Sequence, residues 1–157
     1  AKTERDAEQA QYDALLDLYH KKFANPGLAL MALAKPLLRP AEFSNKLDFI
    51  WYELWHHEGR RARMGVSMMG PDYTHWHGTY EVAKNFYAEL VPELEELVHK
   101  GRDSKDPEKV KAAEVLEAKL REVLDSPDHR WFDNKMDPAE VERRKKAMEE
   151  FNVRYRG

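Results

Sequence analysis

Tyrosine, histidine and tryptophan are concentrated in one short stretch, GPDYTHWHGTY, at residues 70–80. Phenol and imidazole are groups that transfer protons, bind metals and support redox chemistry, and imidazole titrates near neutral pH. Tyr73, His75 and His77 are the candidates in this stretch, and His56 and His57 form a pair shortly before it. These five residues are therefore the first candidates for a functional site.

The histidines do not complete a zinc-protease motif. His57 and Glu58 begin the pattern HExxH, but residue 61 is arginine where the second histidine is required. His75 and His77, with His56 and His57, could bind zinc or iron across a helix pair, yet we expect no carboxylate pattern to orient the imidazoles. For each histidine taken singly, a hydrogen-bonded structural role is the default interpretation.

The composition indicates one helical, highly charged chain. Its 157 residues fit one domain, and the net charge of −3 argues against a nucleic-acid partner. No apolar run reaches the roughly 20 residues that span a membrane, so no membrane partner is expected. The absence of cysteine excludes disulfides, thiolate metal sites and covalent attachment of heme c through this chain. The opening AKTERDAEQAQ lacks the apolar stretch of a signal peptide, so we expect that none is present in this chain.

Apolar residues at helical spacing predict the elements that position the candidates. The predicted core helices cover residues 3–24, 44–69, 71–100 and 105–125, and a charged C-terminal helix covers 138–150. We therefore predict an all-α fold, a single helical domain over residues 1–157, built as a bundle of long antiparallel helices with short loops.

Proline and glycine mark the expected ends of these helices. NPG at residues 25–27 and Gly70–Pro71 should interrupt the chain, and Ser44 or Asn45 should cap the second helix. Trp76 and Tyr80 fall on the apolar stripe of the third helix and are expected in the core. The inward residues of the fourth helix are expected to be Ala113, Leu116, Leu120 and Val123.

Three motifs follow one another within residues 53–90. They are HHEGRRAR at 56–63, MMGPDY at 68–73, and WHG at 76–78 followed by YEVA at 80–83. In these motifs the segment resembles the C-terminal helical segment of the octaheme cytochromes c of the hydroxylamine oxidoreductase family, which includes hydrazine dehydrogenases. Outside this segment the two agree only in having long amphipathic helices. The resemblance implies a bundle of long helices that packs three subunits into a trimer.

The resemblance also implies a role for one tyrosine. Members of the family oxidise hydroxylamine or hydrazine at one unusual heme, and the other hemes carry the electrons away. In the oxidative members, a tyrosine of a neighbouring subunit is bonded covalently to the catalytic porphyrin, whereas reductive members lack it. By its place in MMGPDY, Tyr73 matches that tyrosine, and Tyr80 is the weaker candidate. A phenol can form a radical and couple to a porphyrin carbon, and the bond distorts the macrocycle.

The remaining candidates would then serve the heme or the substrate. His75 and His77 could act as an axial ligand or as a proton relay, and His56 or His57 could ligate a heme iron. Guanidinium pairs with carboxylates in two parallel hydrogen bonds, so the arginines suit heme propionates, with surface ion pairs as the equal alternative. These arginines are Arg60, Arg61 and Arg63.

The chain departs from the family because it has no CxxCH motif. The resemblance then implies a heme-free portion or subunit, whose partner is a heme-bearing cytochrome c chain and whose substrate is a small nitrogen compound. No redox activity is expected from this chain alone. Because heme c is attached outside the cytoplasm, the expected location is the periplasm or an anammoxosome-like compartment. The alternative is a structural helical module for oligomerisation, without a redox role.

Overall fold

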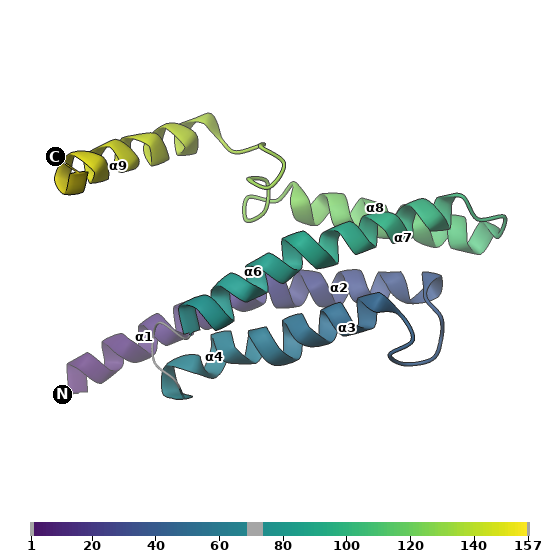
Figure 1. Ribbon diagram of the computed structural model, residues 1–157, viewed down its shortest axis with the longest axis horizontal. Helices are drawn as coiled ribbons and strands as arrows, with labels where there is room; N and C mark the ends of the chain where they lie inside the picture. Colours follow the sequence, from purple (N-terminus) through teal and green to yellow (C-terminus); the bar gives the residue numbers. More distant parts are fainter. Residues whose placement is uncertain (1, 69–73, 157) are drawn as a thin grey trace. The chain divides into compact units, whose positions relative to one another are not determined.

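The computed structural model describes residues 2–68 and 74–156, and within these residues the chain forms helices and turns with no strand (Figure 1). The prediction of an all-α fold is therefore confirmed. The chain divides into two compact units, residues 1–121 and 122–157, which are treated separately below. The prediction of a single domain stays a prediction.

The first helical rod contains α1 (Lys2–Tyr19), a π-helical turn η1 (His20–Ala24), α2 (Asn25–Ala34) and a 3₁₀ turn η2 (Lys35–Leu37). The expected interruption at residues 25–27 is wrong, because Asn25 has φ −67° and ψ −47° and the helix continues. Pro26 lacks a backbone N–H and its ring crowds the preceding turn. The wider π turn directly before it accommodates the ring without ending the helix.

The second rod contains α3 (Lys46–Tyr52), a π turn η3 (Glu53–Glu58) and α4 (Gly59–Met68). As predicted, Asn45 precedes its first helical residue. The backbone is extended at Asn45, and its N–H donates a hydrogen bond of 3.1 Å to the Asp48 carboxylate. This bond satisfies a backbone donor at the end of the helix, where no intrahelical acceptor is available.

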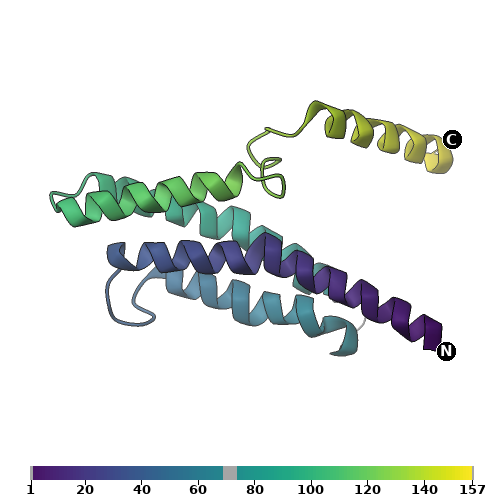
Figure 2. The ribbon, with the colours of Figure 1, turned by 180° about the vertical axis from the view of Figure 1, so that it is seen from behind.

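The third rod contains η4 (His75–Tyr80), α6 (Glu81–Asn85), η5 (Phe86–Leu90) and α7 (Val91–Arg102). Both η4 and η5 are π turns, and η5 ends two residues before Pro92, as η1 ends two residues before Pro26. The three rods lie along one another, and α8 (Pro107–Leu124) runs beside α7 (Figures 1 and 2). The predicted break at Gly70–Pro71 lies outside the described residues.

The core of the first unit is formed by apolar side chains from all three rods and α8. Phe23 meets the ring of Phe86 edge-on, with 5.4 Å between the ring centroids. The predicted inward face of α8 is confirmed, because all four of its residues are buried. Each fully buried aliphatic side chain contributes about 1.5–3 kcal/mol. The largest fully buried aliphatic residues of this unit are Leu30, Leu47, Leu54, Leu90, Leu94 and Leu116.

Trp76 and Tyr80 do not lie in the core, so that prediction is wrong. The two side chains are 56% and 54% exposed, and their rings contact each other with 5.7 Å between centroids. They belong to the π turn η4, in which each hydrogen bond joins residues five apart in the sequence instead of four. The extra residue changes which side chains of the helix face the core. Thr74, Gly78 and Val82 are buried instead.

The second unit contains turns followed by α9 (Pro138–Arg156), which continues past the predicted end at residue 150. The charged run at residues 142–150 is exposed, as predicted for a solvated face. At the start of α9, Glu140 accepts hydrogen bonds of 2.7 Å and 2.8 Å from Arg143 and Arg144. These two guanidinium groups lower the pKa of the Glu140 carboxyl to about 2.

Candidate functional site

The two consecutive histidines of the second rod have different surroundings. His57 is partly exposed, and its Nδ1 lies 2.6 Å from the Glu53 carboxylate, one helical turn away. The ring of His56 stacks on Tyr52, with centroids 4.7 Å apart and an angle of 12° between the planes. The Nδ1 atom of His56 is buried and has no hydrogen-bond partner among the described residues. His56 is therefore the more constrained of the pair and retains an unused ring nitrogen.

A shared carboxylate connects His77 to Arg61. The Nδ1 atom of His77 lies 3.2 Å from one oxygen of Glu81, and Nη1 of Arg61 lies 3.5 Å from the other. This bridge joins α4 to α6, so Arg61 takes part in an ion pair between helices. The expectation that no carboxylate orients the histidines is wrong for His57 and His77, since each is paired with a glutamate four residues away.

Two of the predicted site residues lie outside what the structure describes. Tyr73 falls in the interval 69–73, and for His75 only the backbone is described, as the first residue of η4. Tyr80, the weaker tyrosine candidate, is exposed on η4. The structure therefore tests neither the tyrosine role nor a ligand role for His75.

The other two arginines of the motif differ from Arg61. Arg60 is exposed. Nε of Arg63 donates a 3.0 Å hydrogen bond to the carbonyl oxygen of Gly59, and its guanidinium lies 5.5 Å from the centre of the Tyr19 ring. Among the described residues, no carboxylate is paired with Arg63. Its two terminal nitrogens are therefore available to an anion.

Two buried polar groups near the contact of the first and second rods were not among the site residues expected from the sequence. Tyr19 and Glu58 are each 6% exposed, and Tyr19 Oη and Glu58 Oε2 have no hydrogen-bond partner in the described parts of the chain. Burial raises the pKa of both groups, with Arg63 opposing the shift at Tyr19 and Glu53 adding to it at Glu58. One signal was present: Glu58 continues the apolar spacing of Leu47, Trp51 and Leu54.

Glycine at position 59 allows Tyr19 to approach the second rod. A Cβ atom at residue 59 would lie 2.2 Å from Tyr19 Oη and 2.9 Å from the Leu54 carbonyl oxygen. Gly78 has a similar role between the second and third rods, since its Cβ would lie 2.7 Å from the backbone of Ala62. These two glycines bring all three rods close together around Tyr19 and Arg63.

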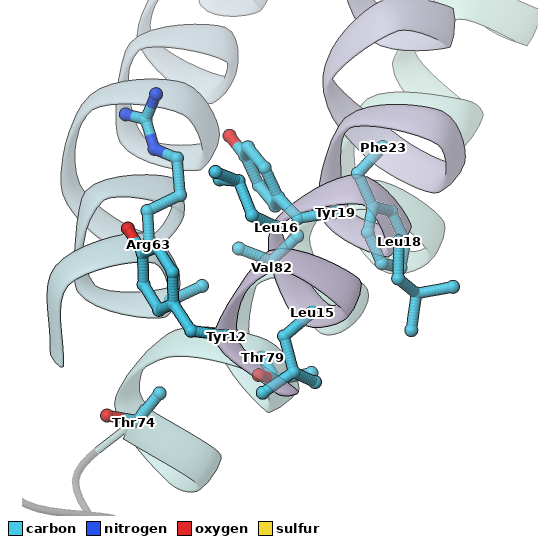
Figure 3. A pocket seen from close by; sticks show the side chains of 11 residues that line it. Tyr12, Leu15, Leu16, Leu18, Tyr19, Phe23, Arg63, Thr74, Thr79 and Val82 are labelled. Atoms are coloured by element: carbon cyan, nitrogen blue, oxygen red, sulfur yellow. The ribbon is translucent and has the colours of Figure 1, made fainter. Parts of the chain in front are cut away.

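A small apolar pocket lies between the three rods at this point (Figure 3). Its cavity has a volume of about 50 Å³. The Arg63 guanidinium and the Tyr19 hydroxyl lie at one end, and Thr74 lies toward the other. The lining residues are Tyr12, Leu15, Leu16, Leu18, Tyr19, Phe23, Ala62, Arg63, Thr74, Thr79 and Val82.

The described residues include no group of three or more histidine, aspartate or glutamate side chains that could hold a metal ion. None of the helices in the described ranges is long and apolar enough to cross a membrane. The arrangement can bind an anion through Arg63, and one imidazole nitrogen of His56 has no partner among the described residues.

Comparison of the chain with protein-family models, with curated proteins and with solved structures found no match.

Proposed function

We propose that this chain is the heme-free helical portion or subunit of a hydroxylamine oxidoreductase-like multiheme complex. In this proposal Tyr73 is cross-linked to the catalytic heme of a neighbouring chain, and the helices mediate assembly of a trimer. The observation that carries the proposal is the order of HHEGRRAR, MMGPDY and WHG within residues 53–90. The substrate would be a small nitrogen compound, and the location would be outside the cytoplasm.

The packing of the second and third rods supports this proposal. The close approach of Gly78 to Ala62 brings the WHG motif against the helix that carries the three arginines. The pairing of Arg61 and His77 with Glu81 fixes the two motifs in one relative position. Tyr73 lies between these two motifs in the sequence.

The residues present fit a heme contributed by another chain. In this proposal His56 ligates an iron, and the exposed guanidinium of Arg60 pairs with a propionate. When bound, heme c supplies the electron-transfer chemistry. In the same proposal His57 is an alternative ligand, Arg61 positions the rods through Glu81, and His75 and His77 move the protons that substrate oxidation releases.

Purification from the native host with its partners tests the proposal. A heme-bearing chain should co-purify, and mass spectrometry should find a peptide containing Tyr73 attached to porphyrin. A colourless homo-oligomer with unmodified Tyr73 would contradict the proposal.

A second candidate is a structural helical module for oligomerisation, with Tyr73 free. It is favoured by the large apolar side chains that remain exposed in the first unit, including Leu15, Leu28 and Trp76 at 54%, 61% and 56% exposure. The purification described above separates the two candidates, because the structural module would form an oligomer without heme.

A further inference from the structure

The apolar pocket between the three rods is the feature that the proposed function leaves unused. Its cavity of about 50 Å³ is several times the roughly 10–15 Å³ that one water molecule requires. Its interior is formed by Phe23 and Val82, which are 6% and 1% exposed, while Leu15 and Leu18 at its edge are 54% and 47% exposed. The apolar surface therefore extends from the core to solvent, as a binding site for a small molecule requires.

The charge of the pocket indicates the kind of molecule it binds. Among the described residues that line it, Arg63 is the only charged one and none is acidic. Its Nε donates a hydrogen bond to the Gly59 carbonyl oxygen, and its guanidinium carbon lies 5.5 Å from the centre of the Tyr19 ring, so the guanidinium is held in place. A fixed guanidinium without a carboxylate partner among the described residues favours an anion with two oxygens.

The charged group of the pocket and the buried Tyr19 hydroxyl share one end, whereas Thr74 lies toward the other. The Tyr19 hydroxyl lies at the same end as the Arg63 guanidinium, is buried, and has no hydrogen-bond partner in the described structure (Figure 3). The hydroxyl can donate a hydrogen bond to an anion that Arg63 holds. Glu58, the nearest buried carboxyl, does not line the pocket. A ligand with one anionic end and one apolar end matches this distribution.

We propose that this pocket binds a small aliphatic monocarboxylate. The carboxylate lies on the Arg63 guanidinium and the Tyr19 hydroxyl, and the hydrocarbon chain lies over Val82 toward Leu15 and Leu18. This site is separate from the proposed role of Tyr73 and does not depend on it. Its test needs no heme-bearing partner, so the failure of either proposal can be recognised independently of the other.

Titration of the full chain with hexanoate, followed by NMR of the leucine and valine methyl groups, tests the site. Hexanoate should shift the methyl signals of Leu15, Leu16 and Val82 in a saturable manner. 1-Hexanol, which has the same chain length and no charge, should bind about tenfold more weakly or worse, as expected for the loss of a charge-assisted hydrogen bond. Equal binding of the two compounds, or no shift at these methyl groups, would overturn the proposal.

Two variants and a matched control identify the residues responsible. Arg63→Gln should weaken hexanoate binding about tenfold or more, whereas Arg121→Gln, which removes an exposed arginine of α8 paired with Glu117, should leave it unchanged. If Arg63→Gln fails to fold, Leu15→Glu provides the same test, because residue 15 is 54% exposed and a carboxylate there should repel the ligand. Undiminished binding in Leu15→Glu, or equal losses in Arg121→Gln and Arg63→Gln, would contradict the assignment.

Discussion

Tyr19 and Gly59 approach each other so closely that residue 59 has no room for a side chain. A Cβ atom there would lie 2.2 Å from Tyr19 Oη, well inside van der Waals contact. The contact joins the first rod to the second at the end of η3, where Glu58 is also buried. The packing of these rods therefore depends on one glycine, and its substitution provides the first prediction.

Gly59→Ala should lower the free energy of unfolding by about 1–3 kcal/mol, the usual cost of overpacking a core. Tyr19→Phe in the same chain should recover part of this loss, because it removes the nearest atom but leaves the Leu54 carbonyl oxygen 2.9 Å away. Urea unfolding of the two single variants and the double variant measures the coupling. Strictly additive effects would show that the two residues are not in contact.

Gly78→Ala should also destabilise the protein by about 1–3 kcal/mol, because the new Cβ would lie 2.7 Å from the Ala62 backbone. In an open helix the same change stabilises by about 1 kcal/mol, so the sign of the effect reports the close approach. Ala88→Gly, at an exposed helical position, provides the matched control for helix propensity. A more stable Gly78→Ala variant would show that the second and third rods are further apart.

Glu58→Gln should increase stability at neutral pH by about 1 kcal/mol, because the wild-type protein buries a carboxyl whose Oε2 atom has no hydrogen-bond partner among the described residues. Burial raises the folded-state pKa of Glu58 above its unfolded value. The contribution of the Glu58 carboxyl to the free energy of unfolding is therefore fully present below its unfolded-state pKa. This contribution is lost as the pH rises through the raised folded-state pKa. The difference between variant and wild type should grow over that interval.

Urea unfolding from about pH 4 to about pH 8 measures this difference, since the range begins near the ordinary carboxyl pKa. Glu95→Gln is the matched control, because Glu95 lies exposed on α7. A stability difference for Glu58→Gln that stays constant with pH would mean that the carboxyl is not buried.

Glu140 should titrate at about pH 2 in carboxyl-detected NMR, because Arg143 and Arg144 both donate hydrogen bonds to it. A lowered folded-state pKa means that its contribution to α9 is present above the unfolded value and is lost as the pH falls through about 2. In the double variant Arg143→Gln/Arg144→Gln, the titration should move up toward the ordinary carboxyl range. Glu150→Gln should leave the Glu140 titration unchanged.

Tyr73→Phe should abolish oxidation of the nitrogen substrate by the assembled complex and leave assembly intact. The reason, under the proposed function, is that phenylalanine has no phenol oxygen and cannot form the radical that couples to porphyrin. Activity assays and size-exclusion chromatography of the complex measure the two properties. Tyr80→Phe is the control, and normal turnover by Tyr73→Phe would exclude the assigned role.

The sequence alone determined the helical class and several local features. Apolar spacing predicted the inward face of α8 over Ala113–Val123. Ser44 or Asn45 was predicted to cap the second helix, and Asn45 is the residue before α3 begins at Lys46. The pairs Glu53–His57 and His77–Glu81 have the four-residue spacing of helical neighbours and could have been predicted in the same way. These features depend on residues within about one or two helical turns of each other, so the local sequence contains the information.

Only the tertiary structure decided which face of each helix is buried after a π turn. The turn at η4 leaves Trp76 and Tyr80 exposed, and the turn at η1 carries the first helix through Pro26. Tyr19 and Arg63, which line the same pocket, are 44 positions apart in the sequence. No periodic pattern specifies such a contact, because it depends on how closely the rods approach, and Gly59 and Gly78 permit that approach.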